Sequence, residues 1–306
     1  MPDRPGGNVT VIWLPERSRH QRRVVAALYE QAAAVPCERR AVFAGGLRGA
    51  DKDGALAGAA IDRSRYFAIS IDLVLAELAR RSLIPVVAGV SPMEGADLVH
   101  TEAQHIAKRL AGRAAADGRN LLLDVTMGSE PSVRSWLVNL GLAAYSVDVV
   151  IATISSEDAA RWADAEHRRG HEEYRRGHGN GGHYVPEEAI QAAALLAAAL
   201  AESDWAAILQ HVAGQQEVAF PRGELLSLAR AYRDGRITLA DIGAQLRIRR
   251  LQPVPPACPP GLDDAKPALD DLEPWAAGSF DEIVFACDLG LLSDDDYATI
   301  AEAIVS

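Results

Sequence analysis

The stretch Arg40–Leu56, with the sequence RAVFAGGLRGADKDGAL, is the part of the chain that predicts the fold. Ala41–Ala44 has the composition of a short buried strand, and a glycine-rich loop follows it directly. Lys52 comes next, at the start of a segment that can form a helix. A strand, a glycine-rich loop, a lysine and a helix are typical of a phosphate-binding loop, because its backbone N–H groups and lysine contact phosphate oxygens.

The loop keeps only part of the phosphate-binding motif G-x-x-x-x-G-K-[ST], with which residues 46–53 align. Gly46 matches the first glycine, and Lys52 matches the lysine. Asp51 stands in the place of the second glycine, and Asp53 in the place of the Mg²⁺-binding hydroxyl. Glycine-rich turns also join ordinary strands to helices, so this stretch alone leaves both interpretations open.

Composition limits the class of protein and its partners. A chain of 306 residues suits one large domain or two modest ones. The net charge of -11 argues against a nucleic-acid partner, which favours a basic face. The sequence has no long apolar run and no signal-peptide pattern, so we expect no membrane partner. The scattered cysteines, without C-x-x-C spacing, indicate reduced thiols in a cytoplasmic protein.

Strand and helix patterns alternate along the first two hundred residues. Apolar runs predict further strands at Tyr66–Asp72, Asn120–Thr126 and Ser146–Ile154. Helical periodicity predicts helices at Glu16–Val35, Leu73–Arg80, Pro92–Asp117, Ser132–Leu140 and Ser156–Arg169, and Ser82–Pro92 is expected to be a loop. Alternating strands and helices require crossover connections, so the predicted fold class is α/β, with a parallel sheet flanked by helices.

Polar residues gather where the predicted strands end. Lys52, Asp72, Asp124 and Thr126 all fall at or just beyond these ends. Ligands of parallel sheets bind beyond the carboxyl ends of the strands. We therefore expect these side chains to share one site.

The rest of the chain is predicted to be helical, after a polar segment rich in glycine (Arg168–Glu188). One helix begins at Pro186 and runs to about Ala201. Further helices are expected at Ser203–Val212, Phe220–Arg233, Thr238–Leu246, Phe280–Leu289 and Ser293–Val305, with a proline-rich break at 253–260. The expected domains are accordingly 1–202 and a helical C-terminal extension, 203–306.

Five stretches, in this order, resemble the zeta-toxin family of P-loop kinases, whose members resemble UDP-N-acetylglucosamine kinases. GGLRGADKDGAL (Gly45–Leu56) is similar to the family's GG-x-PGAGKS, and ISID (Ile69–Asp72) ends on the family's strand-end aspartate. HTEAQHIAKRL (His100–Leu110) resembles the h-x-E-A helix, and NLLLDVT (Asn120–Thr126) resembles N-x-x-x-[DE]-x-T. Arg168–Glu188 resembles a basic helix followed by GR-x-VPEE.

The resemblance covers roughly residues 16–200 and implies a P-loop kinase-like fold. It implies ATP-dependent phosphoryl transfer to a hydroxyl of a nucleotide sugar, with ATP and Mg²⁺ as cofactors and an antitoxin protein as a candidate partner. The implied catalytic residues are Lys52, Asp72 and Arg169, with Arg168 and Arg175 as alternatives to Arg169. The other implied roles are nucleotide binding by Gly46, Gly49, Ala50, Asp51, Lys52 and Asp53, acceptor binding by Glu102, Thr126 and His183, and Mg²⁺ binding by Asp53 and Asp124.

Three departures from the family pattern favour a competing interpretation. Asp51 and Asp53 add negative charge to a loop that must bind an anion, and His183 replaces an arginine. The alternative is a catalytically degenerate relative that acts by nucleotide or protein binding. Asp72 is also compatible with a helix cap, and Glu102 with a solvent-facing helix position.

The histidines of the polar segment raise one further alternative. His167 and His171 are four residues apart, as in helical metal sites. No cysteine and no ordered ligand pattern accompany them, so a polar loop near phosphates is the favoured interpretation.

Overall fold

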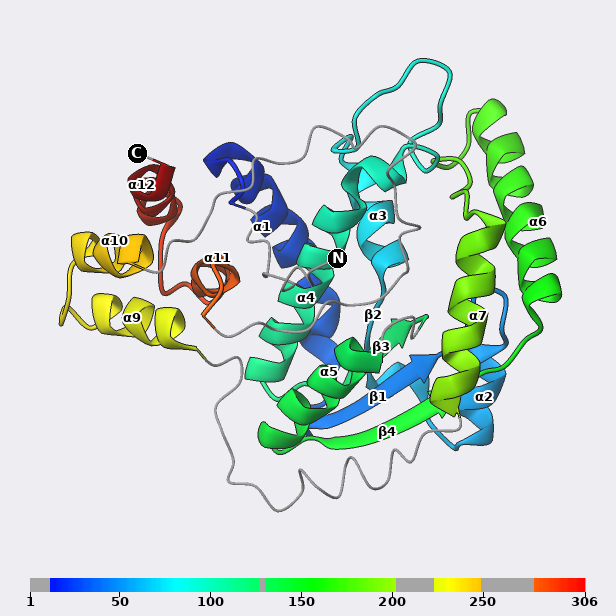
Figure 1. The fold of residues 1–306 in the computed structure, drawn as a ribbon, viewed down its shortest axis with the longest axis horizontal. Coiled ribbons are helices and arrows are strands. Elements are labelled where there is room, and N and C mark those ends of the chain that lie inside the picture. The colour runs from blue at the N-terminus through cyan, green and yellow to red at the C-terminus, as the bar shows by residue number, and fades with distance from the viewer. Residues whose placement is uncertain (1–11, 127–129, 202–222, 249–277, 306) are drawn as a thin grey trace, which may run out of the picture. The chain divides into compact units, whose positions relative to one another are not determined.

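The structure is a computed structural model that describes residues 12–126, 130–201, 223–248 and 278–305 (Figure 1). The chain divides into two compact units. The larger unit comprises Ala27–Phe220 and Asp263–Trp275, and the smaller comprises Met1–Ala26, Pro221–Leu262 and Ala276–Ser306. Among the described residues, 12–26 thus group with the C-terminal segments.

A four-stranded sheet with the order β2-β3-β1-β4 forms the centre of the larger unit. Every pairing between neighbouring strands is parallel, and Ala44 of β1 lies opposite Asp124 of β3. The strands are β1 (Arg40–Gly45), β2 (Phe67–Ile69), β3 (Leu121–Val125) and β4 (Ser146–Ile151). The predicted α/β fold with a parallel sheet is confirmed.

The central strands are apolar because both of their faces are covered. Val42 and Phe43 of β1 and Leu121–Leu123 of β3 are all buried. Continuous apolar runs of this kind are typical of parallel strands packed between helices.

Helices link and cover these strands. They are α2 (Lys52–Gly58), α3 (Ile71–Arg80), α4 (His100–Ala116), α5 (Glu130–Leu142), α6 (Ser156–Arg175) and α7 (Glu187–Ala201), with short 3-10 helices η1 (Glu30–Ala34), η2 (Arg63–Arg65) and η3 (Ala96–Val99). Helices α3 and α4 lie side by side, as do α6 and α7 (Figure 1).

Several predicted boundaries are wrong. The strand predicted at Tyr66–Asp72 ends at Ile69, because the Ser70 hydroxyl accepts a hydrogen bond from the Leu73 N–H (3.1 Å) and caps α3. Asp72 therefore lies in the first turn of α3. The helix predicted at Pro92–Asp117 is shorter, since η3 precedes α4 and α4 begins only at His100.

Helix α6 continues six residues beyond its predicted end at Arg169, through Gly170. A Cβ at Gly170 would lie 2.6 Å from the Gly182 Cα, and one at Gly182 would lie 2.3 Å from the His167 carbonyl oxygen. The glycines therefore allow the loop after α6 to pack directly against the helix.

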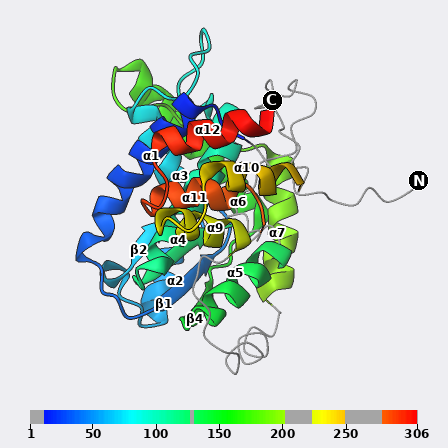
Figure 2. The same cartoon turned by 90° about the vertical axis from the view of Figure 1, so that its left-hand side faces the viewer.

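The smaller unit contains the first part of α1 (Pro15–Tyr29) and four C-terminal helices. The four are α9 (Glu224–Arg233), α10 (Leu239–Ile248), α11 (Asp281–Asp288) and α12 (Asp294–Val305) (Figure 2). They confirm the helices predicted in these regions. The helix predicted at Ser203–Val212 and the proline-rich break at 253–260 lie outside the described residues.

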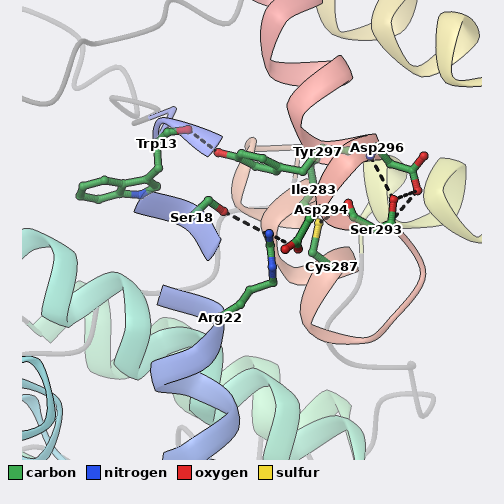
Figure 3. A network of polar contacts seen from close by, with 9 residues as sticks. All are labelled: Trp13, Ser18, Arg22, Ile283, Cys287, Ser293, Asp294, Asp296 and Tyr297. Carbon is green, nitrogen blue, oxygen red and sulfur yellow. Dashed lines mark hydrogen bonds and ion pairs between the residues drawn. The ribbon is translucent and has the colours of Figure 1, made fainter. Parts of the chain in front are cut away.

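Polar contacts join α1 to α12 within the smaller unit (Figure 3). The buried Tyr297 hydroxyl donates to the Trp13 carbonyl oxygen (2.8 Å). Arg22 pairs with Asp294, and its guanidinium lies 5.7 Å from the centre of the Tyr297 ring. These contacts explain why the N-terminal residues group with the C-terminal helices.

A buried carboxylate caps α9 from a distant part of the sequence. Glu282 of α11 accepts hydrogen bonds from the Leu226 N–H (2.9 Å) and from the Gly278 N–H. A Cβ at Gly223 would lie 1.8 Å from a Glu282 oxygen, so the start of α9 requires glycine.

Candidate functional site

A cavity of about 380 Å³ lies beyond the carboxyl ends of β1 and β3. From β1 the chain crosses to β2 at one edge of the sheet, and from β3 it crosses to β4 at the opposite edge. This is the switch point at which α/β sheets bind ligands. The cavity is lined by Leu47, Arg48, Gly49, Ala50, Asp51, Lys52, Asp53, Arg63, Ser70, Ile71, Asp72, Asp124, Val125, Thr126, Trp162 and Glu166.

The cavity brings together most of the residues proposed from the sequence. Those that line it are Gly49, Ala50, Asp51, Lys52, Asp53, Asp72, Asp124 and Thr126. Gly46, Glu102, Arg169 and His183 are not among the lining residues.

Lys52 and Asp124 form the central ion pair of the cavity. The Lys52 ammonium lies 2.6 Å from an Asp124 carboxylate oxygen and 3.4 Å from the Val125 carbonyl oxygen. Both side chains are partly shielded from solvent, with 18% and 28% of their surfaces exposed. Because Lys52 begins α2 and Asp124 is near the end of β3, the pair is held by two neighbouring strand ends.

Asp72 is positioned by a cation and stands close to a buried histidine. Arg48 of the glycine-rich loop forms an ion pair with the Asp72 carboxylate. The His183 Nδ1 atom lies 4.0 Å from the same carboxylate, and its Nε2 atom lies 3.5 Å from Asp97. His183 thus stands behind Asp72. Arg48 was missed from the sequence because it occupies an unspecified position of the motif.

The glycines of the loop are required by its shape. Gly46 has φ +137° and Gly49 has φ +82°. A Cβ would lie 2.4 Å from the Ala152 carbonyl oxygen at Gly46, and 2.7 Å from the Trp162 Cγ at Gly49. The loop conformation therefore depends on both glycines, as in the pattern that identified it.

Asp51 caps the start of α2 with its own carboxylate. Its carboxylate accepts the Gly54 N–H (2.8 Å) as the N-cap. The Ala50 N–H donates to the Leu47 carbonyl oxygen (3.1 Å), and the Lys52 N–H donates to that of Ala50 (2.8 Å). The loop thus satisfies these three N–H groups itself, and Lys52 and Arg48 are the donors that suit an anion best.

The oxygen donors near Lys52 fit Mg²⁺ in part. Asp53 lines the cavity at the position of the hydroxyl of the intact motif, where it is exposed and forms an ion pair with Arg63. Asp124 and Thr126 line the cavity, and carboxylate and hydroxyl oxygens are hard ligands that suit Mg²⁺. Within the described residues no three His, Cys, Asp or Glu side chains form a metal cluster, so phosphate and water oxygens would complete the coordination.

Glu102 and Arg169 lie in environments that differ from their implied roles. Glu102 is 3% exposed within α4, which rules out the solvent-facing position left open by the sequence. Arg169 is 68% exposed on α6, and its guanidinium lies 3.9 Å from Glu166. Arg168, its first alternative, is also exposed and pairs with Asp164 (2.9 Å).

Helix α6 contributes two lining residues that sequence analysis did not identify, Trp162 and Glu166. They are four residues apart and so lie on one helix face. In the sequence, the four-residue spacing indicates only that the aromatic and the acidic residue share a helix face. The tertiary structure shows that this face is turned to the cavity.

Histidines of α6 attach the helix to the loop before α4. The His171 Nδ1 atom lies 3.3 Å from a Glu94 carboxylate oxygen, and the His167 Nε2 atom lies 3.8 Å from it. The pKa of Glu94 is lowered: burial acts to raise it, but hydrogen bonds from Ser91 and the charges of both histidines outweigh burial. The pair therefore serves here as a contact between loop and helix.

Comparison with protein-family models and with curated protein sequences finds no match to this chain. Among the described helices, none has the length and apolar character needed to cross a membrane.

Proposed function

We propose that this chain is a phosphotransferase that moves a phosphoryl group from ATP to a hydroxyl of a nucleotide sugar. The observation that carries the proposal is that the Lys52–Asp124 ion pair and Asp72 line one cavity at the switch point of a parallel sheet. Phosphoryl transfer is catalysed mostly by positioning and by charge stabilisation, and this cavity supplies a cation, a metal-binding carboxylate and a candidate base.

The phosphate side of the cavity is formed by the glycine-rich loop. Lys52 binds the phosphate oxygens, and Arg48, from the same loop, is the arginine best placed to assist it. With Lys52 on a phosphate, the Asp124 carboxylate would be free of its ion pair, and Asp124 and Thr126 would hold the metal ion. Bound Mg²⁺ supplies neutralisation of the charge on the transferred group.

The acceptor side of the cavity is formed by the start of α3. Asp72 accepts the proton of the attacking hydroxyl, because it is a carboxylate that faces the same cavity as Lys52. The ion pair with Arg48 keeps its carboxylate in place, and the His183 Nδ1 atom lies 4.0 Å from it. Glu102 and Arg169 do not line the cavity and have no role in this proposal.

The negative charge of the residues that line the cavity favours a second function, in which the chain binds a nucleotide or a protein without transferring a phosphoryl group. The three lining cations, Arg48, Lys52 and Arg63, are each paired with an aspartate, and five carboxylates line the cavity in the described part of the chain. Asp51 also caps α2 where a phosphate would bind. These features weaken anion binding and fit a relative that binds nucleotide, or another protein, without catalysis.

The two functions are separated by a transfer assay. The full chain is incubated with Mg²⁺, labelled ATP and a panel of UDP-sugars, beside the Lys52→Met and Asp72→Asn variants. Label on a sugar, lost in both variants, supports the phosphotransferase. Lys52-dependent binding of ATP without transfer supports nucleotide binding as the second function. A chain that neither transfers label nor binds ATP overturns both the phosphotransferase and nucleotide binding.

A further inference from the structure

Helix α6 is fixed against the glycine-rich loop by small side chains. Ala159 and Ala163 are buried in a cluster with Leu47 of the loop and with Ile190 and Ala193 of α7. Alanine allows the helix backbone to approach closely. The next face of α6, which carries Trp162 and Glu166, is thereby held at the cavity.

The Trp162 indole rests on the loop and still presents surface to the cavity. A Cβ at Gly49 would lie within 2.9 Å of the Trp162 Cβ, Cγ and Cδ2 atoms, so the ring system packs against the glycine itself. The side chain nevertheless remains 40% exposed. A rigid aromatic surface in a polar cavity is suited to stack on a flat ligand group.

Glu166 adds hydrogen-bond acceptors one helical turn further along. As a carboxylate it only accepts hydrogen bonds, and so selects groups that carry O–H or N–H. Arg169 Nη2 lies 3.9 Å from its nearest oxygen, which is longer than a hydrogen bond. The carboxylate is therefore able to turn to a ligand.

We infer that Trp162 and Glu166 form the subsite for the sugar ring of the substrate: the C–H face of the ring stacks on the indole, and Glu166 accepts hydrogen bonds from its hydroxyl groups. The inference rests on the proposed function for the class of ligand. The negative face of an aromatic ring attracts weakly positive C–H groups.

A sugar fits this arrangement better than a nucleobase. Trp162 is the one aromatic side chain among the described residues that line the cavity. A base exposes two flat apolar faces, and one aromatic surface covers only one of them. The pyranose ring of N-acetylglucosamine carries axial C–H groups on its faces and a rim of equatorial hydroxyl groups, which matches an indole with a neighbouring carboxylate.

The test compares UDP-N-acetylglucosamine with UDP, by calorimetry on the full chain. Trp162→Leu and Glu166→Gln should each weaken binding of the nucleotide sugar by about three- to tenfold, since one ring contact or one hydrogen bond is lost. Binding of UDP should change by less than twofold. Trp162→Phe keeps an aromatic ring and should restore most of the affinity.

Matched controls come from the same helix. Tyr174→Leu and Glu173→Gln alter an exposed aromatic and an exposed acid of α6 outside the cavity, and should leave both affinities unchanged. Thermal unfolding of each variant verifies that α6 is intact.

The outcomes separate this subsite from the proposed reaction. Selective loss of sugar-nucleotide affinity in a chain that transfers no phosphate supports the subsite and removes the phosphotransferase. Equal loss for UDP and the nucleotide sugar overturns the subsite, as does a wild-type chain that binds UDP-N-acetylglucosamine no better than UDP.

Discussion

The Lys52 ammonium and the Asp124 carboxylate, 2.6 Å apart, connect the start of α2 to strand β3. A phosphate that binds Lys52 competes with Asp124 for the ammonium. When the Lys52 ammonium leaves Asp124 for the phosphate, a cation that binds Asp124 takes its place as the positively charged partner. Binding of the anion and of the cation should therefore be coupled, each favouring the other.

Lys52→Met tests the anion site at nearly constant side-chain length. We expect affinity for a non-hydrolysable ATP analogue to fall at least about tenfold, since a hydrogen bond to a charged group contributes about 1.5–3 kcal/mol. Calorimetry at low salt gives the affinity. Arg161→Met, which breaks exposed ion pairs on α6 outside the cavity, is the control. Unchanged affinity in Lys52→Met would remove residues 46–53 as the nucleotide site.

Asp72→Asn tests the proposed base. Turnover should fall by roughly two orders of magnitude, as for a lost general base, while the ATP analogue still binds. Ser70, not Asp72, supplies the capping oxygen of α3, so a folding defect is not expected to mimic this loss. Asp158→Asn, which changes an exposed aspartate of α6 outside the cavity, serves as the control and should leave turnover unchanged. Near-normal turnover in Asp72→Asn would eliminate the base assignment.

The central strands and the position of the cavity could be predicted because the signals are local. Ala41–Ala44 and Leu121–Leu123 are continuous apolar runs, and both are buried. Lys52, Asp124 and Thr126 follow such runs, and parallel pairing places their strand ends together. Sequence order and composition were sufficient for this part of the site.

Other features depend on contacts that local patterns do not contain. Asp72 was expected at a strand end, but the Ser70 cap starts a helix before it. Trp162 lines the cavity because alanines on the neighbouring face pack against the loop and α7. Trp13 belongs with Tyr297, which is 284 residues away in sequence, and no periodicity indicates such a pair.

Tyr29 should make stability fall at alkaline pH. Burial, together with the hydrogen bond that its hydroxyl donates to Asp117, raises the pKa of Tyr29 to about 12. The unfolded chain ionises near pH 10, so it loses this proton first. The stabilisation is present below about pH 10 and is lost as the pH rises toward 12. Denaturant unfolding at pH 8 to 11 should show a smaller fall for Tyr29→Phe, and parallel curves would contradict the prediction.

Tyr297→Phe tests whether the N-terminal residues are joined to the C-terminal helices. It leaves the buried Trp13 carbonyl oxygen without its Tyr297 donor, at a cost of about 1–3 kcal/mol. The control is Tyr232→Phe, which removes a hydrogen bond to Asp296 (2.9 Å) on the less buried side of the unit and should cost less. Urea unfolding measures both. Equal small losses would show that the contact with Trp13 contributes nothing.

The last prediction is that the loop's two aspartates, more than His183, limit ATP binding. The Asp51 carboxylate accepts a hydrogen bond from the Gly54 N–H, and Asp53 forms an ion pair with Arg63. Each aspartate therefore occupies a donor that could otherwise bind an anion. Two unit charges 4 Å apart interact by about 4 kcal/mol at an effective dielectric constant of 20, and replacing the carboxylates removes this repulsion of phosphate. Glycine at an N-cap costs only a few tenths of a kcal/mol relative to aspartate, so the loop should tolerate the change.

Asp51→Gly with Asp53→Ser should therefore tighten binding of the ATP analogue by about tenfold or more. His183→Arg alone should do much less, because that position is buried between Asp72 and Asp97, and either carboxylate would pair with the new guanidinium. Asp62→Ser, which removes the exposed cap of η2 outside the cavity, controls for lost negative charge. A double variant that binds no better than the parent would mean that the loop is built for another ligand. A parent that already transfers phosphate at full rate would instead make Asp53 a Mg²⁺ ligand, released from Arg63 on binding.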